Sequence, residues 1–169
     1  YNWGKAVDGT TGSTEWRGLH KLDEIVHVYN PATGWIQNCN STPFTVSGSS
    51  SPKKENFPNY MAPDGENFRA VNAARVLNNQ QAFTIDKTIA AGYDTYMALF
   101  EILIPALISS FEKNVQATDT LYNQLSGPVH ILKKWDYYSD EKSVATTLAI
   151  EWAEKLSRDI RRVYIEEGE

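Results

Sequence analysis

The chain has 169 residues, of which 41% are hydrophobic and 12% aromatic, so it can form the core of one folded domain and is not intrinsically disordered. Its 16 basic and 21 acidic residues give a formal net charge of -5, which argues against nucleic acid as a main partner. The single cysteine, Cys39, excludes an internal disulfide framework. Glu101 and Pro105 interrupt the longest apolar stretch, which predicts no membrane span and no membrane partner.

The composition changes near residue 63 and divides the sequence into two regions. Residues 1–63 are rich in Gly, Ser, Thr, Asn, Pro and Trp, which is typical of strands and loops. Residues 64–169 are rich in Ala, Leu, Ile, Glu and Lys, which favours helices. We therefore predict an α+β protein, in which a short β-hairpin or strand region is followed by a mostly helical array.

The predicted hairpin lies in the first region. Two runs with strand character, 25–29 and 35–37, are separated by the turn-forming segment Asn-Pro-Ala-Thr-Gly at 30–34. Pro31 fixes its own φ, and Gly34 can supply a positive φ where the turn ends. We expect the two runs to pair as antiparallel strands.

Two shorter helices are expected at the beginning of the second region. The first follows Asp64, a candidate N-cap, and continues through Leu77 in an Ala-rich segment. Thr84 is a candidate N-cap for the second, at 85–91.

Three longer helices are expected after these. An apolar helix begins at Asp94 or Thr95, and Pro105 should kink it. Another covers about 118–135 and is expected to be interrupted by a Gly-Pro pair. The last covers about 143–165, and its apolar stripe at helical spacing predicts a helix that packs on one face.

The sequence shows no self-contained active site, because it has no Gly-x-Ser-x-Gly, Gly-rich phosphate loop or His-Glu-x-x-His. Asn38 and Asn40 flank Cys39 where the chain leaves the second predicted strand, although asparagine has low strand propensity. Either their amides bind loop backbone, or one of them donates to a ligand or a developing oxyanion. Cys39 is either a small buried filler or a nucleophile, although no histidine is near it in sequence. Arg69 is either a surface residue or an arginine that holds a polar group at a site.

Several short motifs occur in order along nearly the whole chain. They are Trp-Arg-Gly at 16–18, Asn-Pro-x-x-Gly-Trp-Ile-x-Asn-x-Asn-x-x-Pro at 30–43, Gly-Glu-Asn-x-Arg at 65–69 and Leu-x-x-Trp-Asp at 132–136. Together they resemble the β chain of the penicillin acylase (penicillin amidase) family of N-terminal-nucleophile hydrolases. The resemblance implies that the chain is an internal fragment of an αββα sandwich enzyme.

The resemblance also implies a chemistry, the cleavage of an acyl-amide bond. In the family, a precursor cuts itself into α and β chains, and the first residue of the β chain is a serine nucleophile whose own α-amino group acts as base. Asn40 matches the motif asparagine whose side-chain amide holds the oxyanion of the tetrahedral intermediate. Arg69 matches the arginine that supports this amide, and Asn38 matches the first motif asparagine, with an expected structural role near the site.

Departures from the family pattern define what this chain is expected to lack. Tyr1 is not Ser, Cys or Thr, so the nucleophile is expected upstream of this chain, and the isolated chain is expected to be inactive. The segment at 37–44, Gln-Asn-Cys-Asn-Ser-Thr-Pro-Phe, resembles acylases of fatty-acyl amides, such as acyl-homoserine-lactone acylases, more than it resembles the penicillin acylases themselves.

The resemblance also sets expectations about partners, cofactors and location. The expected partners are the remainder of the β chain, the α chain of the same precursor and a small acyl-amide substrate. As an isolated fragment, the chain is also expected to pair with a second copy through unpaired edge strands. No cofactor is expected in this chain, because calcium in the family is bound by residues outside it, and the expected location is periplasmic or secreted.

A second interpretation is a non-catalytic binding or interaction domain. Trp3, Trp16 and Trp35, with nearby tyrosines, could form an exposed aromatic surface for a sugar or a peptide. Joint exposure of Trp16 and Trp35 would favour this interpretation.

Overall fold

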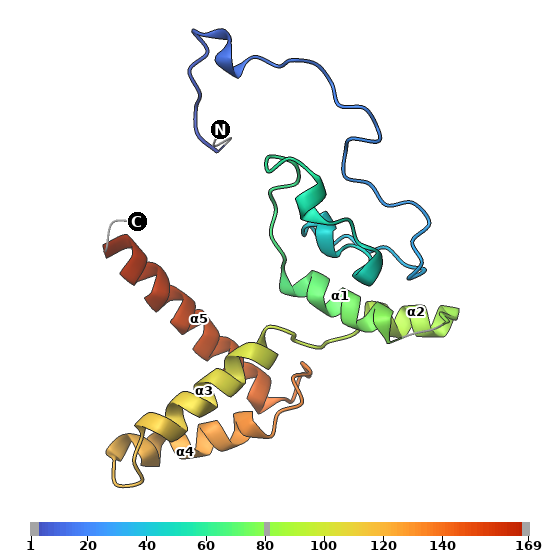
Figure 1. Ribbon diagram of the computed structural model, residues 1–169. Coiled ribbons are helices and arrows are strands. Elements are labelled where there is room, and N and C mark those ends of the chain that lie inside the picture. The colour runs from blue at the N-terminus through green and yellow to red at the C-terminus, as the bar shows by residue number, and fades with distance from the viewer. Residues whose placement is uncertain (1–3, 80–81, 167–169) are drawn as a thin grey trace.

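The structure is a computed structural model that describes residues 4–79 and 82–166 (Figure 1). Within these ranges, the chain before Phe68 consists of loops and short 3-10 helices, and the α-helices follow. The 3-10 helices are Gly12–Thr14, Pro43–Thr45, Gly48–Ser50 and Lys54–Asn56. The α-helices are α1 (Phe68–Asn78), α2 (Ile85–Gly92), α3 (Phe100–Asn114), α4 (Thr120–Lys133) and α5 (Val144–Glu166).

The predicted β-hairpin is wrong, and with it the α+β fold class. Residues 25–29 and 35–37 form no strand. Across the described ranges, β pairing is limited to one isolated antiparallel bridge between Tyr96 and Tyr138, so the described protein is helical. The expected pairing of two copies through edge strands depends on these strands, and the described residues give it no support.

Local hydrogen bonds explain why residues 35–37 do not pair with residues 25–29. The predicted turn does form, because the Gly34 N–H donates to the Pro31 carbonyl at 2.9 Å. The backbone after the turn then bonds to the loop that follows it. The Gln37 N–H donates to the Val46 carbonyl at 2.9 Å, and the Ser47 hydroxyl donates to the backbone carbonyl at position 35 at 2.7 Å. Two of the groups that a strand partner would need, the Gln37 N–H and the carbonyl at position 35, are therefore already occupied.

The starts of the first two helices show how side chains define helix boundaries. The Asn67 side-chain oxygen accepts the Ala70 N–H at 3.1 Å, so α1 begins after Asn67, and Asp64 is not its cap. The predicted cap of α2 is confirmed, because the Thr84 hydroxyl accepts the Lys87 N–H at 3.3 Å.

The later helices agree with the sequence in number but differ in boundaries. α3 begins at Phe100 instead of Asp94 or Thr95, because the Asp94 carboxylate accepts the Tyr96 N–H and the Tyr96 bridge holds this segment extended. α4 continues through Gly127 and Pro128 without the expected interruption. The last predicted helix, 143–165, corresponds closely to α5.

The core lies where α3, α4 and α5 pack together (Figure 1). Its buried members are Phe100, Ile104, Leu132, Trp135 and Ala149. The Phe100 and Trp135 rings meet edge to face with centroids 5.2 Å apart, and the Trp135 indole N–H donates to the Tyr138 carbonyl at 3.0 Å. These buried aromatic and aliphatic side chains form the hydrophobic core of the helical region. None of the helices in the described ranges is long and apolar enough to cross a membrane.

Candidate functional site

The Asn-x-Asn motif forms a tight loop with a constrained backbone. The Asn38 side-chain oxygen accepts the Asn40 N–H at 3.0 Å. Asn40 has a φ of 55°, in the left-handed region, which asparagine tolerates better than most residues. The Asn38 side chain thus binds loop backbone, while the exposed Asn40 side chain points to other partners.

Asn67 connects this loop to the start of α1. Its side-chain nitrogen donates to the Cys39 carbonyl at 3.0 Å and to the Asn40 carbonyl at 3.1 Å. Its side-chain oxygen caps α1 by accepting the Ala70 N–H. Sequence reasoning did not single out Asn67, although an N-cap residue directly before an Ala-rich helical run was the signal that could have found it.

Arg69, in the first turn of α1, contacts the side chain of Asn40. Its two terminal nitrogens lie 3.4 and 3.5 Å from the Asn40 side-chain oxygen. A guanidinium only donates, so the atom that faces it must be the amide oxygen of Asn40. The Asn40 side-chain nitrogen is therefore directed away from Arg69, and it makes no hydrogen bond within the described part of the chain. The structure thus brings Asn38, Asn40 and Arg69 together at one place.

Arg69 also lies on the wall of a groove with a volume of about 800 Å³ between α1, α2 and the segment that leads into α3. Most of the groove is apolar, and its largest apolar lining residues are Phe68, Leu77, Phe83, Met97, Leu99 and Phe100. The exposed pair of Asn40 and Arg69 therefore lies next to this largely apolar groove.

A partly buried ion pair connects α1 with the segment that leads into α3. Arg75 donates to the Asp94 carboxylate at 2.6 Å, and Asn72 donates to the same oxygen at 2.9 Å. Burial alone would raise the pKa of Asp94, but the hydrogen bonds from Asn72 and Arg75 outweigh it and lower the pKa below its ordinary value. The Arg75 guanidinium also stacks 4.2 Å from the centre of the Tyr96 ring.

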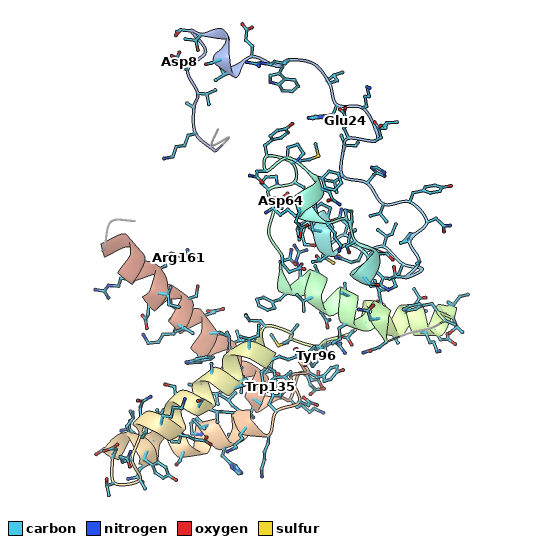
Figure 2. All side chains as sticks on the ribbon, in the orientation of Figure 1. Asp8, Glu24, Asp64, Tyr96, Trp135 and Arg161 are labelled. Atoms are coloured by element: carbon cyan, nitrogen blue, oxygen red, sulfur yellow. The ribbon has the colours of Figure 1, made fainter. Side chains whose placement is uncertain are left out.

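Tyr96 stands at the junction between α1 and the helical bundle (Figure 2). Burial and a hydrogen bond to the Glu101 carboxylate raise the pKa of Tyr96 to about 12, so the phenol stays protonated at neutral pH. Its ring also meets the Tyr138 ring, with centroids 5.0 Å apart. Through Arg75 on α1 and through Glu101 and Tyr138, Tyr96 thereby connects α1 to the first turn of α3 and to the segment between α4 and α5.

Neither a metal site nor a joint aromatic platform is found among the described residues. No group of three or more His, Cys, Asp or Glu side chains within the described ranges could hold a metal ion. Trp16 is 85% exposed, but Trp35 is only partly exposed and packs against Gly48. Joint exposure of Trp16 and Trp35 is thus not observed, and Trp3 lies outside the described residues.

The sequence was compared with models of known protein families. The sequence matches the family model for penicillin amidase over residues 4–166, which includes the Asn-x-Asn loop, Arg69 and all of the α-helices. A match over nearly the whole chain shows membership, and membership implies an enzyme of the amidohydrolase type. The chain therefore belongs to the penicillin amidase family.

Proposed function

We propose that this chain supplies the oxyanion donor of an acylase that cleaves linear acyl-amides, with Asn40 as the donor and Arg69 as the residue that orients it. The observation that carries the proposal is the contact of both Arg69 terminal nitrogens with the Asn40 side-chain oxygen. Because this contact occupies the oxygen, the amide N–H₂ group is left to donate to a developing negative charge.

In the proposed mechanism, the nucleophile is an N-terminal serine that lies outside these 169 residues. Its hydroxyl attacks the substrate carbonyl and gives its proton to the serine α-amino group, which later passes it to the leaving amine. The carbonyl oxygen becomes an oxyanion in the tetrahedral intermediate, and Asn40 donates a hydrogen bond to it. Water then attacks the acyl-enzyme carbonyl and gives a proton to the α-amino group, and Asn40 donates a hydrogen bond to the second oxyanion as well. The bond to the serine oxygen breaks, the α-amino group returns a proton to that oxygen, and the carboxylic acid is released. On its own, the chain should hydrolyse no amide.

The substrate class follows from the resemblance of the motif loop. The segment 37–44 is similar to acylases of fatty-acyl amides, and we therefore propose long-chain acyl-amides, acyl-homoserine lactones among them, over phenylacetyl amides. Comparison of kcat/KM for the two acyl groups in the complete enzyme tests this preference.

The function is tested by kinetics of three variants of the complete enzyme, each with a thermal melt. Asn40→Ala should lower kcat on the order of a hundred- to a thousand-fold, or about 3 kcal/mol, with a much smaller change in KM. Arg69→Ala should lower kcat in the same direction, because the Asn40 amide loses the contact that orients it. Asn38→Ala serves as the comparison, since it should act through the stability of the loop. A fully active Asn40→Ala enzyme would refute the oxyanion assignment.

A further inference from the structure

We infer that Asn67 is a positioning residue for the proposed oxyanion site, because one side-chain amide both begins α1 and fixes the backbone of Asn40. This inference rests on the proposed function of Asn40. It concerns a residue that touches the motif loop and the helix, and that is not itself expected to touch the substrate.

The first step is the match between the Asn67 amide and its three partners. The side-chain oxygen accepts the Ala70 N–H at 3.1 Å, while the side-chain nitrogen donates to the Cys39 carbonyl at 3.0 Å and the Asn40 carbonyl at 3.1 Å. The asparagine side chain suits these partners because its amide carries an acceptor oxygen and an NH₂ group with two donor hydrogens. Aspartate caps a helix equally well, but an ionised carboxylate has no proton to donate to the two carbonyls.

The second step is the backbone conformation that these bonds hold. Asn40 occupies the left-handed region with a φ of 55°, which a residue with a side chain adopts at a cost. Asn38 accepts its N–H, and Asn67 binds its carbonyl and the carbonyl before it. Because φ determines where the Cα–Cβ bond points, these contacts set the direction of the Asn40 side chain.

The third step is that Asn67 also sets the distance between Asn40 and Arg69. Arg69 follows Asn67 by two residues, in the first turn of the helix that Asn67 caps. The same amide therefore fixes the loop that carries the proposed donor and the helix turn that carries its orienting arginine. A small displacement of a group that acts on the transition state can cost about a hundred-fold in rate.

The test uses Asn67→Asp, which keeps the helix cap and removes the donor to the loop, in the complete enzyme. The two lost hydrogen bonds, at about 0.5–1.5 kcal/mol each, should lower the melting temperature by about 2 to 10 °C. We expect kcat to fall by about ten- to a hundred-fold and KM to change by less than about threefold. Asn67→Ser is the second variant, because serine also caps well but is too short to reach both carbonyls at once. Wild-type kcat in either variant would overturn the inference.

The matched control is Thr84→Ala, which removes the N-cap of α2 without touching the motif loop. It should lower the melting temperature by about 2 to 4 °C and leave kcat unchanged. An equal loss of kcat in Thr84→Ala would show that loss of any helix cap is enough, and would overturn the inference.

A double variant separates this inference from the proposed function. If Asn67 acts through Asn40, then Asn67→Asp should cost little further kcat in an Asn40→Ala background. Full additivity of the two losses would overturn the positioning role while leaving the oxyanion proposal intact. Wild-type activity of Asn40→Ala alone would instead refute the proposed function, and the inference with it.

Discussion

Removal of the Asp94 carboxylate should destabilise the protein, because this group joins α1 to the segment that leads into α3. Its side chain is 18% exposed and that of Arg75 is 27% exposed. One oxygen accepts from Arg75 at 2.6 Å, from Asn72 at 2.9 Å and from the Tyr96 N–H at 3.1 Å. A hydrogen bond to a charged group contributes about 1.5–3 kcal/mol and a neutral one about 0.5–1.5 kcal/mol.

These values do not simply add, because the partly exposed partners regain water when Asp94 is removed. Arg75 also keeps its contact with the Tyr96 ring, at 4.2 Å from the ring centre. We therefore expect Asp94→Ala to lower the free energy of unfolding by about 2–3 kcal/mol. Asp94→Asn keeps an acceptor oxygen and loses the charge, so it should cost about 1 kcal/mol.

The assay is urea unfolding followed by circular dichroism, with a thermal melt as a second measurement. For a chain of this size, the expected loss in Asp94→Ala corresponds to a fall in melting temperature of about 5 to 10 °C. The control is Asp159→Ala, which breaks the exposed ion pair between Lys155 and Asp159 on α5 and should change the free energy by less than about 0.5 kcal/mol. The reasoning would be refuted if the free energy of unfolding of Asp94→Ala were within about 0.5 kcal/mol of the wild-type value, because an exposed ion pair contributes about that much.

Two further predictions concern pH and the core. The pKa of Asp94 in the folded protein lies below its ordinary value of 3.8. The contribution of Asp94 to the free energy of unfolding is therefore complete above about pH 4 and is lost as the pH falls through the lower folded pKa. Unfolding measured between neutral and acid pH should show this loss of stability, and the loss should be smaller in Asp94→Asn. Ile104 is 0% exposed, so Ile104→Ala should cost about 2–5 kcal/mol. Ile102 on the same helix is 62% exposed, and Ile102→Ala should cost less than about 1 kcal/mol in the same melts; equal losses would contradict the assignment of the core.

The sequence by itself determined the features that depend on residues close together in the chain. The Thr84 cap and the apolar stripe of α5 predicted these helices nearly at their observed boundaries, since capping and helical periodicity act over a few residues. The ordered motifs at 16–18, 30–43 and 65–69 indicated the family, because they preserve residue types at fixed spacing.

Only the tertiary structure decided which backbone and side-chain groups meet across long distances in the chain. Residues 35–37 have strand character, yet the loop at Val46 and Ser47 takes their hydrogen bonds, and so no hairpin forms. Asp64 and Asn67 have similar capping chemistry, and Asn67 is the cap because its nitrogen also reaches the Asn40 loop, 27 residues away. Such choices depend on which partners the folded chain brings within hydrogen-bond distance, and local propensity carries no information about these partners.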